Sequence, residues 1–404
     1  MSRVVEAIRR GARRRARAPG AALAAAGTWV LAAAASAVVV ATPSDLSAQE
    51  VGAGAVAQTY TFGSPDAAGL ADFRLVTLPL AFSVPVGPYV EIGAATAFAD
   101  GRATGTDGST ASLAGFTDTD LFLSLGLGRD RAALTLGFTA PSGATSLSLA
   151  EATVAGIVAA ELLPFAITTW GSGGGAGGDL ALAFEAGGWG LGLSGGYQAP
   201  RSYEPLDAEA FAYRPGAQMR ARVAVDRRVG SASTLAVVVG VQRFADDALD
   251  DANLFRSGTR VDGSASLTFP VGIRGSGQLH AGAYLRDQGT LLLEAPALDG
   301  AGDSPGQQLL TAGGAFRLPL ADRVVAVPSV DGRVFRTDDG VGQGWLASAG
   351  VGFEIRLAGA SFGRHVLLSP HAAFRRGRAV VREDSESDVT GWEAGVTLRL
   401  AGGS

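Results

Sequence analysis

The chain has 404 residues, and its composition excludes several classes of protein. Hydrophobic residues make up 47% and charged residues 18%, which is too apolar for a disordered chain. Glycine occurs 58 times, about double its ordinary usage. Cysteine is absent and all 33 basic residues are arginine, which excludes disulfides, thiolate metal sites and catalytic or phosphate-binding lysines. The formal net charge of −5 argues against a nucleic-acid partner.

The N-terminal segment has the order of a secretory signal peptide. Arginines dominate residues 3–17, an alanine-rich apolar run occupies 21–41, and small polar residues follow at 42–49. We predict cleavage after Ala48, which divides the chain into a signal peptide at 1–48 and a mature barrel at 49–404. The alternative is an uncleaved membrane anchor, because about 20 apolar residues can span a bilayer.

The remainder of the chain alternates between apolar and small or polar residues with a period of two. The pattern is clear at 121–128, 189–198, 260–269, 345–356 and 391–400. Because a strand directs successive side chains to opposite faces, each of these segments is predicted to have one apolar face.

About sixteen such segments occur, and the connections between them alternate in length. We expect strands at 51–62, 72–83, 88–99, 118–128, 131–140, 178–186, 189–198, 217–228, 233–244, 257–269, 275–286, 308–319, 322–335, 344–356, 364–376 and 389–400. Short turns are expected at 84–87, 129–130, 187–188, 228–231, 270–274, 321–322 and 357–363. Longer polar segments lie at 100–117, 141–177, 199–216, 245–256, 287–307, 336–343 and 377–388. Short turns at one end and long loops at the other are typical of outer-membrane barrels.

These features predict an all-β, up-and-down antiparallel transmembrane barrel of about sixteen strands, with fourteen as the alternative and one helical loop insert. Trp189 and Tyr197 stand at the two ends of one strand, where aromatic girdles lie in such barrels. The predicted location is the outer membrane of a Gram-negative-type bacterium. The alternative is a secreted soluble sandwich, in which the apolar faces of two sheets would pack together.

The 141–177 loop contains apolar residues at helical spacing, and Pro164 ends the pattern. The members of this set are Leu147, Leu149, Val154, Ile157, Val158, Leu162 and Leu163. Such a segment is too apolar to lie bare in water. It is expected either to constrict the lumen and contact a solute or to cap the barrel for stability, with Leu149, Val154, Ile157, Val158 and Leu162 as constriction candidates.

The face predicted to line the lumen carries charges of both signs. The lumen-lining candidates are Arg220, Arg222, Arg260, Asp262, Arg317, Arg333, Glu354, Arg356 and Glu393, with Asp226, Arg286, Asp331 and Arg399 on the same face. Buried charges usually pair, so one interpretation is a set of ion pairs that braces the wall. The other is an arginine-lined constriction that selects anions.

Three loop segments, 245–251, 337–340 and 382–388, are acidic. They are interpreted as solvated faces, or alternatively as carboxylates that divalent cations bridge to lipopolysaccharide phosphates. The expected partners are therefore outer-membrane lipid and lipopolysaccharide, a small solute, and the barrel-assembly machinery.

Catalytic motifs are weak, and the chain is predicted not to be an enzyme, with no catalytic residue, metal site or cofactor. The letters G-x-S-x-G occur at 192–196 and 359–363, but neither match lies at the strand-to-helix turn that this motif needs. Ser369 and His371 share one face of a predicted strand, and this face is directed into the lumen.

Residues 131–198 contain the runs LTLGFTAPSG (134–143), ELLPFAITTWGSGGGAGG (161–178) and DLALAFEAGGWGLGLSGGYQ (179–198). This region resembles outer-membrane channels for hydrophobic compounds, namely the fatty-acid and toluene transporters and related proteins of phenol-degradation pathways. The resemblance implies passive passage of small hydrophobic solutes through a barrel. The family's Asn-Pro-Ala plug motif is missing here, and its barrel has fourteen strands. The alternatives are an anion-preferring general porin and a structural envelope barrel without transport.

Overall fold

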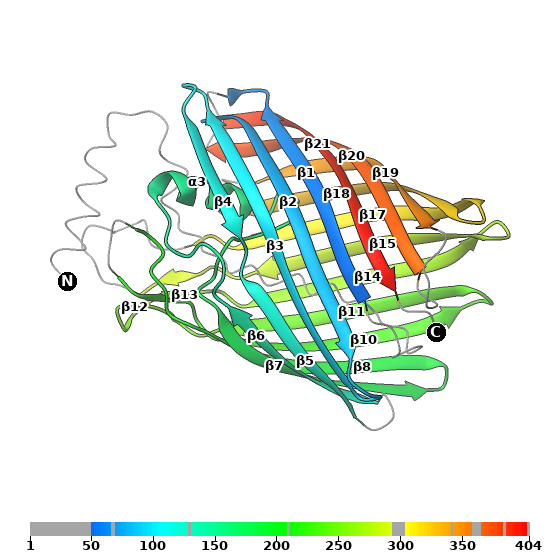
Figure 1. Cartoon of the computed structure of the whole chain (residues 1–404). Coiled ribbons are helices and arrows are strands. Elements are labelled where there is room, and N and C mark those ends of the chain that lie inside the picture. The colour runs from blue at the N-terminus through cyan, green and yellow to red at the C-terminus, as the bar shows by residue number, and fades with distance from the viewer. Residues whose placement is uncertain are drawn as a thin grey trace.

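A sheet that closes on itself forms the body of the protein (Figure 1). The computed structural model describes residues 50–401 except 66–68, 128–130, 208–210, 293–303, 341–342, 358–364 and 383–384. The predicted signal peptide, the turn at 129–130 and most of the turn at 357–363 lie outside the described residues.

The barrel has 16 antiparallel strand positions, which confirms the fold class predicted from the sequence. In order around the wall these are β1 (Glu50–Phe62), β2 (Leu70–Pro85), β3 (Val90–Gly105), β5 (Thr119–Leu127), β6 (Ala132–Ala140), β7 (Gly175–Ala186), β8 (Trp189–Pro200), β10 (Gln218–Val229), β11 (Ser233–Phe244), β14 (Arg260–Val271), β15 (Gly275–Arg286), β17 (Gln307–Ala321), β18 (Val324–Thr337), β19 (Gly344–Leu357), β20 (His365–Arg382) and β21 (Ser385–Ala401). The last strand, β21, pairs with β1 from Glu50↔Ala401 to Phe62↔Val389 and closes the wall.

The apolar parity of the strands faces outward. On β8, the side chains of Trp189, Leu191, Leu193 and Tyr197 are 40 to 51% exposed, although all four are large and apolar or amphipathic. The alternate residues, Gly190, Gly192, Ser194 and Gly196, are less exposed and line the inside of the barrel. A face of this kind is stable where hydrocarbon replaces water, because a closed sheet leaves no backbone group unpaired in lipid.

The predicted loops at 100–117 and 377–388 are wrong, because most of each is strand. At the second, β20 continues to Arg382 and β21 begins at Ser385, with Gly377↔Val389 and Arg378↔Asp388 in register. At the first, β3 continues to Gly105, and β4 (Thr110–Phe116) folds back beside it, with Phe98↔Phe116 and Thr104↔Thr110 in register. A break at Thr117–Asp118 then separates β4 from β5. The small and polar residues of this hairpin give a weak alternating pattern, so only the pairing with β3 identifies it as strand.

Three other predicted loops also contain short strands. A second, four-stranded sheet lies beyond the barrel at the long-loop end, formed by β9 (Tyr213–Arg214), β12 (Asp247–Leu249), β13 (Ala252–Arg256) and β16 (Thr290–Leu291) (Figure 1). Strands this short carry too few residues for a period of two to be recognised in the sequence.

The predicted helix of the 141–177 loop is present but shorter than its apolar spacing indicated. α3 (Leu149–Val158) begins at Ser148, whose hydroxyl accepts a hydrogen bond from the Glu151 amide while the Glu151 carboxylate accepts one from the Ser148 amide. The helix ends at Ala159, well before Pro164. Among the described residues, no helix is long and apolar enough to cross a bilayer.

The orientation of the two strand faces gives a first prediction. Leu193→Arg places a charge on the lipid-facing side of β8, and we expect it to lower the free energy of unfolding in lipid vesicles by about 2–4 kcal/mol. The measurement is denaturant unfolding followed by tryptophan fluorescence. Thr268→Arg, on the lumen face of β14, is the control and should cost much less. Equal costs at the two positions would contradict the assignment of the faces.

Candidate functional site

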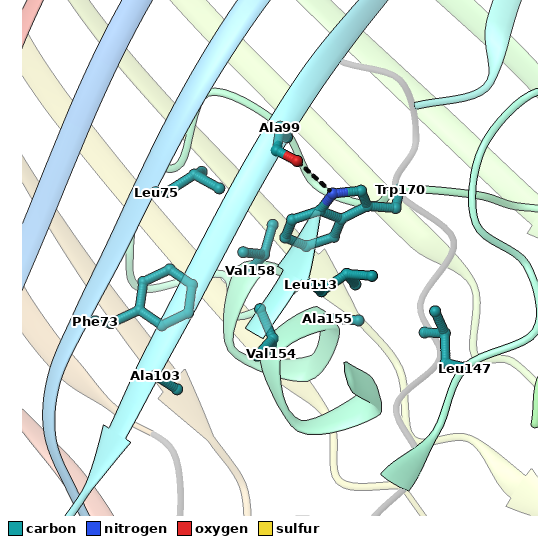
Figure 2. Packing of buried hydrophobic residues seen from close by; sticks show 10 residues of the cluster. All are labelled: Phe73, Leu75, Ala99, Ala103, Leu113, Leu147, Val154, Ala155, Val158 and Trp170. Carbon is teal, nitrogen blue, oxygen red and sulfur yellow. Dashed lines mark hydrogen bonds between the residues drawn. The ribbon is translucent and has the colours of Figure 1, made fainter. Parts of the chain in front are cut away.

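The helical segment of the 141–177 loop packs against the inner face of the barrel wall (Figure 2). Val154 and Val158 of α3 are fully buried against Phe73 and Leu75 of β2 and the small residues of β3. The remaining members of this first hydrophobic cluster are Ala99, Ala103, Leu113, Leu147, Ala155 and Trp170. The Trp170 indole Nε1 donates a hydrogen bond to the Ala99 carbonyl, 3.2 Å away, so even its polar atom is satisfied by the wall.

After the helix, the chain crosses toward another part of the wall. Leu162 and Leu163 are buried in a second hydrophobic cluster with Tyr60, Tyr284, Phe335, Leu346 and Val389, which come from β1, β15, β18, β19 and β21. Phe165 contacts both clusters through edge-on ring contacts with Tyr60 and Phe73. The segment is therefore held across the lumen and narrows it.

Gln58 on β1 holds this crossing by its side-chain amide. Its Nε2 donates to the Pro164 carbonyl and its Oε1 accepts from the Ala166 amide, both at 2.8 Å. Nε2 also donates to Glu393 at 2.7 Å, and Arg375 donates to the same carboxylate at 2.6 Å. Gln58 is only 1% exposed, so these bonds form in a place from which water is excluded.

Asp118, at the break between β4 and β5, holds the two ends of the inserted segment together. Its carboxylate accepts hydrogen bonds from the Gly143 amide at 3.0 Å and from the amide and hydroxyl of Ser172, each at 2.7 Å. The insert therefore leaves and rejoins the barrel wall at one point.

The opposite part of the inner wall is polar. Register places Arg220, Gln242, Arg260, Arg286 and Gln307 directly opposite one another across β10, β11, β14, β15 and β17. We call this set the arginine row. Among the described residues, neither hydrophobic cluster includes a residue of β7, β8, β10, β11 or β14. The hydrophobic contacts of the insert therefore leave β7, β8, β10, β11 and β14 uncovered, and the arginine row begins on these strands and ends on β15 and β17.

Some lumen arginines have carboxylate partners. Arg220 pairs with Asp179, Arg317 with Glu354 and Arg375 with Glu393. Nearer the periplasmic rim, Arg399 pairs with Glu50 at 2.7 Å. These contacts fit the interpretation that ion pairs brace the wall.

Other lumen arginines have no carboxylate within ion-pair distance among the described residues. These are Arg222, Arg260, Arg286, Arg333 and Arg356. Arg260 lies over the Tyr284 ring, with its Cζ 4.0 Å from the ring centroid, and Arg333 donates to the Glu161 carbonyl at 3.2 Å. A partly buried charge without a partner is costly, and an anion would offset this cost at Arg260, Arg286 and Arg333.

Glycine allows the charged side chains to lie flat against the wall. A Cβ added at Gly196 would lie 1.9 Å from Asp179 Oδ1 and 2.9 Å from Arg220 Nε. Gly196 on β8 lies opposite Arg220 of β10 on one side and opposite Asp179 of β7 on the other. The ion pair therefore occupies the space directly over this glycine.

The structure places all nine lumen-lining candidates on the inner face by strand register. Arg222 and Asp262 lie on either side of Gly240, and Arg356 lies near the periplasmic end of β19. Whether any of these residues contacts a solute stays a prediction. Residues that the sequence did not single out are Gln58, Glu161, Tyr284 and Arg375. Arg375 lies on the same strand face as His371, so the alternation of the strand could have identified it as a lumen residue. Gln58 and Glu161 have no local pattern that distinguishes them.

The five loop candidates have different environments. Val154, Val158 and Leu162 are at most 5% exposed and are covered by the barrel wall, while Ile157 packs at the edge of the first cluster. Leu149 is 59% exposed and belongs to neither cluster. A solute would reach the buried three only if the segment moved.

The acidic 245–251 segment is more ordered than a solvated face. Asp247 is 7% exposed and accepts hydrogen bonds from the Tyr213 hydroxyl and the Gly216 amide, both at 2.7 Å. Burial raises the pKa of Asp247. Asp246 instead pairs with Arg256 at 2.7 Å, which lowers the pKa of its carboxyl group.

Comparisons with known proteins support the fold. No family model matches the chain, and no curated protein matches its sequence. The structure of Pseudomonas putida OprB is similar, with a TM-score of 0.50 and 9% identity over 87% of this chain and 93% of OprB. Pseudomonas aeruginosa OccK1 gives a TM-score of 0.44 and 13% identity over 87% of this chain and 98% of OccK1. An outer membrane channel of Pseudomonas putida F1 gives 0.38 and 14% over 72% of this chain and 95% of that channel.

The chain has the fold of an outer-membrane β-barrel. At these identities the likeness concerns the fold alone, and the location follows from the closed wall and its outward apolar face.

The contacts of Gln58 give a second prediction. Gln58→Ala leaves the Pro164 carbonyl and the Ala166 amide without their partner, which costs about 1–3 kcal/mol locally. We expect hydrogen exchange at the Ala166 amide to accelerate by about tenfold or more. Gln278→Ala, at an exposed lumen position on β15, is the control. Unchanged exchange at Ala166 would mean that the hydrophobic clusters alone hold the segment.

The loop tyrosines give a third prediction. Burial raises the pKa of both Tyr203 and Tyr213 above the free value of 10.0, and the Asp247 carboxylate raises both further. The folded loop thus keeps protons that the opened loop loses, so its stability is complete below about pH 10 and falls as the pH rises above it. We expect cleavage of the 199–216 loop, which contains both tyrosines, by subtilisin to accelerate from about pH 9 to about pH 11, around the ordinary tyrosine pKa.

The control for this pH dependence is Tyr213→Phe. The variant loses the hydrogen bond to Asp247 but cannot ionise, so its cleavage rate should be higher at every pH and depend less on pH. A wild-type rate that tracks the protease's own pH profile would contradict the prediction.

Proposed function

We propose that the protein is a passive channel through which small solutes, hydrophobic ones first among them, cross the outer membrane. The 141–177 segment is proposed to be its constriction. The observation that carries this proposal is the position of the segment, which is fixed across the lumen by two hydrophobic clusters and by Gln58. A barrel whose insert only covered the outer rim would not need contacts on both sides of the lumen.

The apolar side chains of the inner wall support a hydrophobic solute. Phe73 and Leu75 face inward and pack against the insert in the first cluster, so a shift of α3 would expose apolar surface along β2. The second candidate is an anion-preferring porin, and the specific observation in its favour is the arginine row with its partnerless guanidinium groups. The third is a structural barrel without transport.

The chemistry of the lumen supports a channel rather than an enzyme. Ser369 and His371 lie on the inner face of β20, and the nearest carboxylate to His371 is Glu393 at 3.4 Å, which is already bonded to Arg375 and Gln58. Arg375 and Gln58 both donate to Oε2 of Glu393, which leaves Oε1 for His371, but among the described residues no hydrogen bond joins the Ser369 hydroxyl to the His371 ring, as a nucleophile and its base would need. The proposed partners are outer-membrane lipid, lipopolysaccharide and the barrel-assembly machinery.

Removal of the constriction gives the fourth prediction. Asp118 holds Gly143 and Ser172 together, so a two-glycine linker can replace residues 144–170 at this junction with little strain. We expect the deletion variant in liposomes to pass small sugars and propionate faster than wild type. A channel for hydrophobic solutes should also lose its preference for an aromatic hydrocarbon over a sugar of similar size.

The outcomes separate the three candidates. Faster flux with lost hydrophobic preference supports the first, and faster flux with retained anion preference supports the second. Absence of flux in both proteins would refute the channel and favour a structural role. Unboiled gel mobility checks that each variant is folded, and Gln58→Ala, which loosens the segment without removing it, should give an intermediate flux.

A further inference from the structure

Buried polar atoms without partners are concentrated in one part of the lumen. Seven buried side-chain nitrogen or oxygen atoms of the described residues make no hydrogen bond. Five of these lie on the four successive strands β11, β14, β15 and β17, in Gln242, Arg260, Asp262, Tyr284 and Gln307. Such atoms are rare because each costs free energy, so a cluster of them on one patch of wall marks a place suited to a polar ligand.

The patch carries two guanidinium groups, those of Arg260 and Arg286, and one carboxylate, that of Asp262, which lies opposite Tyr284 in the register. Arg260 and Arg286 are directly opposite in the register of β14 and β15, and neither has a carboxylate within ion-pair distance among the described residues. Arg286 lies 5.3 Å from the Phe244 ring centroid and Arg260 lies over Tyr284, so aromatic faces position both guanidinium groups. Two adjacent guanidinium groups favour a carboxylate, which can accept two hydrogen bonds from each.

The constriction segment brings a carboxylate of its own to this patch. Glu161 directly precedes the buried Leu162, and its backbone carbonyl accepts from Arg333. Its side chain interacts electrostatically with Tyr284, Arg286 and Arg333. The Tyr284 hydroxyl makes no hydrogen bond, and the contact of the Glu161 carbonyl with Arg333 places this residue beside the patch.

We propose that Arg260, Arg286 and Tyr284 form a binding site for the carboxylate group of a small organic acid, and that Glu161 occupies this site as an internal competitor. The side chain of glutamate beyond Cα has the covalent structure of propionate, so the loop itself indicates the size and chemistry of the ligand. A bound acid would take over the positive charge that Glu161 neutralises. The inference rests on the proposed channel for access, and it assigns that channel a carboxylate-binding point at its constriction.

The two glutamines at the edges of the site complete the set of polar groups. Gln242 and Gln307 are 4% and 7% exposed and flank the two arginines in the arginine row. Rotation of an amide exchanges its oxygen and its NH₂ group, so each glutamine can present donors to an anion. Leu162 and Phe335, which contact Tyr284 in the second cluster, supply an apolar surface for the alkyl part of the acid.

The test uses propionate, with the neutral propionamide as its matched control. Binding is measured by calorimetry on the folded full-length barrel in detergent, and block of chloride current by propionate is measured in planar bilayers. Glu161→Gln removes the competitor, and we expect propionate to bind about tenfold more tightly because the fraction of vacant sites rises. Propionamide should bind neither protein.

Two further variants test the other side of the site. Arg286→Gln should weaken propionate binding by about tenfold or more, since it removes a charged donor. Tyr284→Phe changes no charge and should weaken binding less. The control is Glu185→Gln, which removes a carboxylate from the inner face of β7.

The results distinguish the site from general attraction of anions. Equal tightening by Glu161→Gln and Glu185→Gln would overturn the proposal, because net charge alone would then explain the effect. Unchanged binding in both Arg286→Gln and Tyr284→Phe would overturn it as well. If wild type binds propionate in calorimetry but carries no current in bilayers, the channel function fails while the binding site stands.

Discussion

Closure of the sheet is the constraint on which the rest of the structure depends. Because β21 pairs with β1 along the whole length of β1, the wall has no open edge in the membrane, and every strand can place its apolar parity in lipid. The same closure creates an interior that lipid does not fill. The side chains of the inner face must therefore be stabilised differently from those in lipid, since they are confined, partly dry and adjacent to one another.

The inward-facing side chains find their partners differently on different parts of the wall. On the side of β1–β4 and β15–β21, the 141–177 segment supplies the buried partners that a soluble protein would obtain from a second layer. On the side of β7–β14, small residues and charges line the wall, and Asp179 balances Arg220 while Arg222 and Arg260 have no such partner. The segment places Glu161 and Leu162 beside the same two strands, β15 and β18, where Arg286 and Arg333 lie close to Tyr284 and Phe335.

The barrel could be predicted from the sequence because its signal is repeated. Each strand such as β8 carries the alternation of period two independently, and the long and short connections follow from the topology. The charged residues of the inner face could be placed by parity for the same reason. The hairpin of β3 and β4 was missed because its small residues alternate only weakly.

The neighbours of each lumen residue could not be predicted, because they depend on register between strands. Arg260 and Arg286 are 26 positions apart in the printed sequence, and only the pairing of β14 with β15 brings them together. The position of Glu161 depends on two clusters that join the insert to distant strands. Gln58 illustrates the limit, because a single glutamine in a strand has no pattern that distinguishes a hydrogen-bond anchor from an ordinary lumen residue.

The glycine at position 196 shows how a glycine-rich wall can hold charged side chains on its inner face. The Asp179–Arg220 pair lies in the space that a methyl group at this position would fill, so the pair adds little thickness to the wall. Alanine there would push both side chains toward the barrel axis. The width of the lumen therefore depends on glycines that lack a side chain as well as on the residues that face the axis. A substitution at such a glycine can narrow the lumen without any change of charge.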